Sequence, residues 1–107
     1  MTTRVRFREA AEADIDEAVS WYAAKSPELS LAFLEAVTEV VDRIARNPRA
    51  FPMRIEDVRQ ASLPRRWPYS LWFVAEPDGS VVIAALHQRR STNIVRRRAK
   101  DSGEPKP

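Results

Sequence analysis

The chain has 107 residues with a hydrophobic content of 44%, eighteen Lys and Arg against fifteen Asp and Glu, and no cysteine. This length suits one domain with a single modest core, and the lack of cysteine excludes disulfides and thiolate metal sites. No apolar run approaches the roughly 18 residues of a membrane span, and the N-terminus lacks the apolar core of a secretory signal, so we expect a soluble cytoplasmic protein.

Charged residues are distributed unevenly along the chain. Residues 9–57 contain eleven acidic and five basic side chains, a balance of −6, whereas residues 58–100 contain nine basic and two acidic ones, a balance of +7. Two blocks of opposite charge can pair within a fold. A concentrated basic half is also typical of a surface that meets a polyanion or an acidic partner.

The acidic half shows three periodic segments. Apolar and basic residues alternate around residues 5–7, which predicts a short strand with one buried face. In residues 9–25 and 27–46, apolar side chains recur at spacings of three and four, which predicts two amphipathic helices. Acidic residues in the first turns of the first helix favour the positive end of its dipole and need no catalytic explanation.

A tight turn is expected between these helices. Ser26 is a good N-cap, and Pro27 suits the first position of the second helix. That helix should end where Asn47 precedes Pro48. A short connection makes the two helices antiparallel neighbours, and we expect Trp21 to be a packing side chain rather than a ligand-binding one.

The second half of the chain contains strand patterns separated by breaks. Residues 47–57 carry two prolines and no clear period, which predicts a surface connection without regular structure. Strands are predicted at residues 58–63, 69–75 and 80–88, with a tight turn at the sequence EPDG before the last of them. Residues 80–88 form the most apolar run, and we expect them to be the central strand.

The order strand, helix, helix, three strands predicts an α+β fold, in which an N-terminal strand and an antiparallel helical hairpin pack on a mostly antiparallel β-sheet. We expect one domain over residues 1–98 and a flexible tail over residues 99–107, with a short helix beginning at Ser91 or Thr92. The two glycines exclude P-loop and Rossmann nucleotide sites. A lone histidine predicts neither a metal site nor a cofactor.

The segment LHQRRSTNIVRRR places the only histidine, His87, ahead of five arginines. In one interpretation, His87 ends a strand and is hydrogen-bonded to Tyr69 or to a backbone group, while the arginines are solvated or paired with the acidic hairpin. In the other, this end of the strand faces a partner or a polyanion, with Arg89 and Arg90 in the site. The arginines at 96–98 are expected in a mobile tail beyond it.

The order and spacing of several motifs resemble the RelE/ParE toxins of bacterial type II toxin–antitoxin modules. The motifs are A..DI.EA..WY, I..NP, VR....PRRWPYSLWFV and ALHQRRSTNIVRRR. The resemblance covers residues 5–98. It implies a growth-arresting toxin that a cognate antitoxin neutralises in a hetero-oligomer, typically by wrapping the toxin with a helix and an extended segment.

The family contains two mechanisms, and the first is catalytic. RelE-like members cleave messenger RNA on the ribosome, where basic side chains bind the phosphate and stabilise the charge that develops on it. For this chain, the resemblance would then make His87, Arg65 and Arg89 catalytic residues of a metal-independent endoribonuclease. The candidate target- or RNA-binding residues under either mechanism are Arg59, Arg65, Arg66, Tyr69, Arg89 and Arg90.

The second mechanism is inhibition of DNA gyrase by ParE-like members, which needs no catalytic group. Active nucleases of the family usually carry a tyrosine close after the last strand, where this chain has Gln88 and Arg89, and the lysines of RelE are missing. We therefore expect a ParE-like gyrase inhibitor without cofactor or membrane partner. A ribosome-dependent mRNA endoribonuclease is the alternative, and a small basic nucleic-acid-binding module is a further one.

Overall fold

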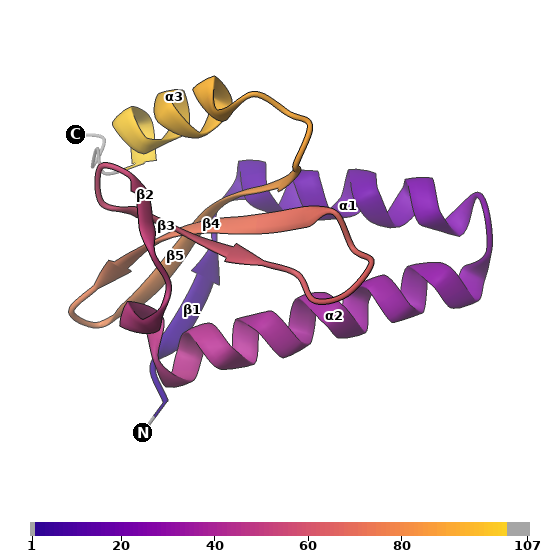
Figure 1. Ribbon diagram of the computed structural model, residues 1–107, viewed down its shortest axis with the longest axis horizontal. Coiled ribbons are helices and arrows are strands. Elements are labelled where there is room, and N and C mark those ends of the chain that lie inside the picture. The colour runs from indigo at the N-terminus through magenta and orange to yellow at the C-terminus, as the bar shows by residue number, and fades with distance from the viewer. Residues whose placement is uncertain (1, 103–107) are drawn as a thin grey trace.

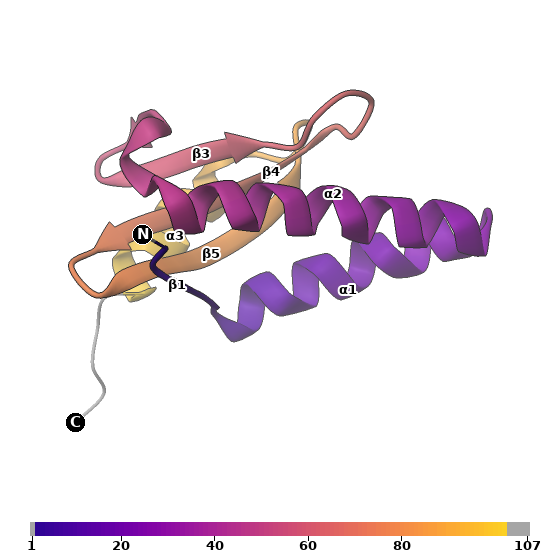
Figure 2. The same ribbon diagram turned by 90° about the horizontal axis from the view of Figure 1, so that it is seen from below.

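A five-stranded sheet carries a helical hairpin on one face and a third helix on the other (Figures 1 and 2). The computed structural model describes residues 2–102. The elements in chain order are β1 (Arg4–Phe7), α1 (Glu9–Ala23), α2 (Pro27–Arg46), the 3-10 helix η1 (Pro48–Ala50), β2 (Met53–Ile55), β3 (Val58–Ser62), β4 (Tyr69–Glu76), β5 (Gly79–His87) and α3 (Thr92–Ser102). The predicted α+β class is confirmed.

The strands lie in the order β1-β5-β4-β3-β2, and β1 runs parallel to β5 while all other pairs are antiparallel. β5 is paired on both sides, as its apolar sequence requires. The prediction that it is the central strand is wrong by one position, since β4 occupies the middle of the sheet. β4 is also apolar on both faces, so hydropathy alone does not predict which of the two strands lies at the centre of the sheet.

The hairpin forms as its sequence predicts. Ser26 Oγ accepts a hydrogen bond from the Leu29 N–H at 3.4 Å, and Pro27 is the first residue of α2. α2 ends at Arg46, immediately before Asn47 and Pro48. The apolar stripes of both helices meet the sheet in one core, whose fully buried members include Phe33, Val40, Ile44, Leu71 and Phe73.

One predicted loop contains regular structure. Residues 47–57, expected to be an irregular connection, hold both η1 and β2. β2 has only three residues and pairs with β3 across a turn in which Glu56 has a positive φ of 51°. A strand this short shows no period in its side chains, because its identity rests on backbone pairing. The expectation of an irregular segment was therefore wrong.

A β-bulge sets which side chains of β5 face the hairpin. Phe73 pairs with Val82, but Trp72 pairs with Ala84, so Ile83 is an extra residue on β5. Before the bulge Val82 packs in the hairpin-side core, and after it Ala85 does so, whereas Ile83, Ala84 and Leu86 pack on the α3 side. The bulge therefore places His87, two residues after Ala85, on the hairpin side.

α3 packs on the opposite face of the sheet, beginning at Thr92 as one of the two predicted starts. Val95 is fully buried there in a cluster with Trp72 and Leu86. The arginines at 96–98 lie in this helix, so the expectation that they belong to a mobile tail was wrong. Ile94 and Val95 hold this helix against the sheet, but two apolar residues among so many charged ones give little sign of a helix in the sequence.

Of the tail predicted from residue 99, residues 99–102 continue α3, and residues 103–107 lie outside the described residues.

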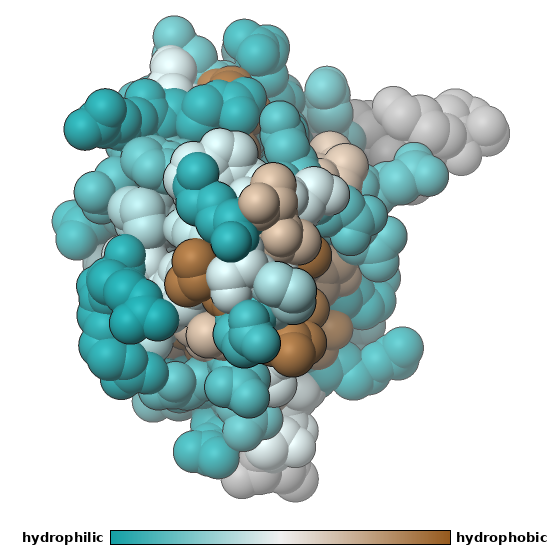
Figure 3. Space-filling view, turned by 90° about the vertical axis from the view of Figure 1, so that its right-hand side faces the viewer, coloured by the Kyte–Doolittle hydropathy of each residue, from teal (hydrophilic) through white to brown (hydrophobic). Residues whose placement is uncertain are grey.

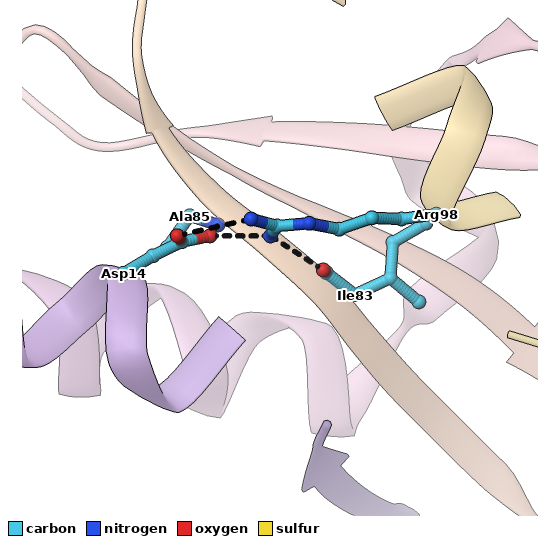
Figure 4. Close-up of polar contacts among 4 residues, drawn as sticks. All are labelled: Asp14, Ile83, Ala85 and Arg98. Atoms are coloured by element: carbon cyan, nitrogen blue, oxygen red, sulfur yellow. Dashed lines mark hydrogen bonds and ion pairs between the residues drawn. The ribbon is translucent and has the colours of Figure 1, made fainter. Parts of the chain in front are cut away.

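Arg98 reaches around β5 and joins α3 to α1 (Figure 4). Its Nη1 lies 2.6 Å from Asp14 Oδ2 and 3.0 Å from the Ile83 carbonyl oxygen. Asp14 Oδ2 also accepts the Ala85 N–H at 2.9 Å. β1 pairs with β5 only as far as Val82, so these two side chains satisfy backbone groups on the edge that β1 leaves uncovered.

Candidate target-binding site

A pocket of about 370 Å³ lies between α1 and the paired ends of β4 and β5, and we call it the β5-end pocket. The register of the sheet brings Tyr69 directly opposite His87. Its apolar lining includes Pro68, Ala85 and Leu86. The remaining lining residues are Asp14, Glu17, Ala18, Trp21 and Tyr22 from α1, and Tyr69, His87 and Arg90 from the sheet end.

The wall of this pocket is built from aromatic rings in contact. The rings of Tyr69 and His87 meet edge to face with centroids 5.2 Å apart, and Tyr22 lies 6.2 Å from Tyr69. Tyr22 also packs edge to face on Trp67 at 5.0 Å and lies 5.1 Å from Phe33 in the core. Such offset and edge contacts add to the stabilisation by burial. These ring contacts therefore connect the pocket wall to the hydrophobic core.

His87 is held by the backbone of the loop that follows it. Its Nδ1 accepts a hydrogen bond from the Arg89 N–H at 3.1 Å, and its carbonyl oxygen accepts one from the Arg90 N–H at 2.8 Å. The expected backbone hydrogen bond of a strand-end histidine is thus confirmed. Because Nδ1 is an acceptor, the neutral ring carries its proton on Nε2.

Both tyrosines of the pocket are neutral donors. Burial raises the pKa of Tyr69, the neighbouring Tyr22 and Glu17 raise it further, and the positive charge of Arg90 opposes them. Burial likewise raises the pKa of Tyr22, with Arg66 opposing it. The two phenols therefore keep their protons well beyond neutral pH and can donate hydrogen bonds to a bound molecule.

These raised pKa values predict a loss of stability at alkaline pH. An unfolded tyrosine ionises near pH 10, before the folded one does, so the stabilisation is complete below about pH 10 and is lost as the pH rises through the higher folded value. We expect the double variant Tyr22→Phe/Tyr69→Phe to lose less free energy of unfolding between about pH 9 and 11 than the parent chain. Urea unfolding at a series of pH values measures this, and parallel curves for the two proteins would contradict it.

The sequence-predicted arginines do not all reach this pocket. Arg59 donates from Nη1 to the Phe51 carbonyl at 2.7 Å and to the Arg49 carbonyl at 3.4 Å, so it holds the η1–β2 segment in place. Arg65 has a positive φ of 60° and forms an exposed ion pair with Glu39 of α2 at 3.3 Å.

The other predicted residues divide between the pocket and its surroundings. Arg66 stacks over the Trp67 ring at 5.0 Å, and Arg89 is exposed in the loop after β5. Tyr69, His87 and Arg90 come together in the pocket, whereas Arg59, Arg65, Arg66 and Arg89 do not line it. The candidate trio of His87, Arg65 and Arg89 is therefore not gathered around one cavity.

A second hollow lies on the other side of the same strand end, between the sheet and α3, and we call it the sheet groove. Its volume is about 330 Å³, and its lining includes Arg54, Arg90 and Arg96 together with His87. Gln60 donates to Ser70 Oγ at 2.9 Å on its floor. No carboxylate lines the sheet groove, and Arg90 and His87 line both hollows.

Sequence reasoning missed the contribution of α1. Trp21, expected to be a packing side chain, does contact the Tyr22 ring edge to face at 5.1 Å, but it is 56% exposed at the rim of the pocket. Lys25 Nζ lies 4.2 Å from its ring centroid. The signal was present, because the apolar stripe of the helix passes through Ala18 and Tyr22 and leaves position 21 on its flank. Asp14 gave no local signal, since its partner Arg98 is 84 residues away.

Two general features limit the chemistry of the described residues. Across residues 2–102, no three His, Asp or Glu side chains lie close enough together to hold a metal ion. None of the helices in this part of the chain is both long and apolar enough to cross a membrane. What the site offers is aromatic surface, two phenol donors and the cation of Arg90.

Comparison with known proteins identifies the family. A chain of the solved structure "Chromosomal ParDE TA system from P. aeruginosa" matches with a TM-score of 0.70 and 21% identity, covering 80% of this chain and 96% of that one, so the fold is shared. No curated protein was found to match. Residues 5–92 match the model of the ParE toxin of the type II toxin-antitoxin system parDE. The resemblance to RelE/ParE toxins is thus confirmed, and the chain belongs to the ParE toxin family.

Proposed function

We propose that this protein is a ParE-like toxin that arrests growth by binding and inhibiting DNA gyrase in the cytoplasm, and that a cognate antitoxin neutralises it. The observation that carries the proposal is the make-up of the β5-end pocket, which combines aromatic rings with the exposed Arg90 and resembles a protein-binding surface. Aromatic and arginine side chains are the commonest anchors of such surfaces.

The placement of the arginines also favours binding over catalysis. Cleavage of a phosphodiester needs cations and a general acid or base around one phosphate. Arg65 instead pairs with Glu39 on α2, and Arg59 is engaged by backbone carbonyls. A gyrase inhibitor needs no such convergence.

The hairpin exposes apolar side chains to which an antitoxin would bind. Figure 3 faces the free end of the hairpin and shows hydrophobic side chains gathered among hydrophilic ones. Leu31 is 63% exposed and Leu34 37% exposed on α2, and Trp21 stands on α1. A partner helix that buries such side chains would gain about 25 cal/mol per Å² of apolar area. This supports a toxin–antitoxin hetero-oligomer.

One observation favours the alternative of a ribosome-dependent mRNA endoribonuclease. The sheet groove gathers His87, Arg90, Arg54 and Arg96 without a carboxylate. A histidine with a free Nε2 beside arginines could exchange a proton with a ribose 2′-hydroxyl or its leaving group. In that mechanism Arg90, rather than Arg65, would stabilise the phosphate.

We expect expression of the chain alone in bacteria to arrest growth, and co-expression of the antitoxin encoded beside it to restore growth. Colony counts after induction measure this. Normal growth with soluble, folded protein at high level would reject the toxin function and favour a small basic nucleic-acid-binding module.

Purified protein separates the two mechanisms. We expect it to inhibit DNA supercoiling by purified gyrase and to leave messenger RNA on translating ribosomes uncut. Cleavage of the messenger at defined codon positions, with gyrase unaffected, would reject the gyrase assignment and support the endoribonuclease.

A further inference from the structure

A third hollow lies away from the β5-end pocket and is lined by the C-terminal end of α2, η1 and β2. Figure 1 shows these three elements coming together at one end of the molecule. The hollow has a volume of about 560 Å³, and we call it the α2–β2 groove. Its charged lining residues are Arg43, Arg46 and Arg54, and its other polar ones are Asn47, Gln60 and Ser62. No carboxylate is among the lining residues.

The three guanidinium groups are only weakly neutralised. Arg46 forms an ion pair with Asp42, one helical turn away, at 3.3 Å. The two side chains are 67% and 66% exposed, and such exposed pairs on a helix stabilise it by only about 0.3 to 0.5 kcal/mol. Arg43 lies over the Phe51 ring at 5.3 Å, which leaves its charge unpaired. Within residues 2–102, neither Arg43 nor Arg54 has an ion-pair partner.

The segment that shapes the groove is itself fixed. Arg59 donates to the carbonyls of Arg49 and Phe51 and so ties η1 to β3. The Gln60 N–H donates to the Pro52 carbonyl at 3.0 Å, so the backbone of β3 is already paired here. Phe51 is buried, so the groove offers little apolar anchor for a peptide.

Further arginine side chains lie next to the α2–β2 groove, in the sheet groove. Arg54 and Gln60 also line the sheet groove, which adds Arg90 and Arg96 on the far side of β2. Guanidinium, amide and hydroxyl groups are the side-chain types that contact phosphate and sugar in nucleic-acid complexes. A succession of such groups along a hollow suits a chain of phosphates better than a single anion.

We propose that the α2–β2 groove binds the phosphodiester backbone of a single-stranded nucleic acid. Arg43, Arg46 and Arg54 contact phosphates, and Asn47, Gln60 and Ser62 hydrogen-bond to phosphate or sugar oxygens. Because no exposed aromatic ring lines the groove, bases do not stack there and binding has no base preference. This site is separate from the β5-end pocket, and its test does not depend on toxin activity.

The test is fluorescence anisotropy with labelled oligothymidylate and oligouridylate of about 15 nucleotides, at several salt concentrations. We expect R43Q/R46Q/R54Q to weaken binding about tenfold or more and to make the slope of log K against log salt shallower by about 2, because each phosphate contact contributes about 0.7. The singles R43Q and R54Q should each change the slope by about 0.7.

The matched control is R4Q/R6Q/R8Q, which removes the same charge from exposed positions in β1 and directly after it. We expect it to weaken binding less than about twofold, and circular dichroism checks the fold of both proteins. Equal losses in the two triple variants would overturn the proposal, because net charge alone would explain binding. Displacement by polyglutamate at equal charge would point to an acidic protein partner instead, and tighter binding of a duplex would also overturn it.

Discussion

Replacing Arg98 with alanine is expected to destabilise the domain by about 2 to 3 kcal/mol and to lower its melting temperature by about 10 to 20 °C. The Asp14 side chain is only 11% exposed and that of Arg98 25% (Figure 4). Without the guanidinium, the carboxylate of Asp14 keeps one donor, the Ala85 N–H, and the Ile83 carbonyl loses its side-chain partner. Because Arg98 is a quarter exposed, the loss is smaller than for a fully buried pair.

Arg97 supplies the control for this prediction. It is the exposed neighbour of Arg98 on α3, and Arg97→Ala should change the free energy of unfolding by less than about 0.5 kcal/mol. Thermal and urea unfolding measure both variants, and a double-mutant cycle with Asp14→Asn measures the coupling of the pair. Equal effects of the changes at 97 and 98 would show that the pair does not anchor α3.

The double variant Arg89→Ala/Arg90→Ala is expected to abolish growth arrest while leaving the fold intact. Both side chains are exposed, and the hydrogen bonds that they make with His87 come from their backbone N–H groups, which alanine keeps. Stability should therefore change by less than about 0.5 kcal/mol. Colony counts and melting temperatures measured on the same proteins separate the two effects.

The comparison variant is Arg96→Ala/Arg97→Ala, which spares the structural Arg98. It should reduce toxicity less, because neither Arg96 nor Arg97 lines the β5-end pocket. A double variant at 89 and 90 that unfolds, or that stays fully toxic, would reject the assignment. Strong loss on changing 96 and 97, with 89 and 90 dispensable, would move the target-facing site onto α3.

The parts of the fold that the sequence predicts are those whose signals are local. The stripes of α1 and α2, the cap at Ser26 and the turn before β5 each depend on residues within a few positions of one another. β2, the parallel pairing of β1 with β5, and the packing of α3 depend on contacts between distant segments. Periodicity carries no information about those contacts.

The site divides in the same way. The sequence indicates that the end of β5 is rich in cations and that Tyr69 lies near His87, because strand order and turn length bring those residues together. The sequence does not show which arginines stabilise the fold and which are exposed for binding. Arg59 and Arg98 stabilise the fold through backbone carbonyls and Asp14, while Arg90 stays exposed, and only the surroundings of each guanidinium distinguish them.

The bulge at Ile83 lets β5 hold one residue more than its pairing with β4 needs, and this extra residue makes the strand tolerant of one change in length. Deleting Ile83 would restore strict alternation and keep Trp72 opposite Ala84. Ala85 and His87 would still face the hairpin, with His87 opposite Tyr69. A deletion between the bulge and His87 that leaves the bulge in place would instead turn His87 to the α3 side. Relatives that lack only the extra residue should therefore keep the same binding surface, whereas a change of one residue after the bulge should redirect it.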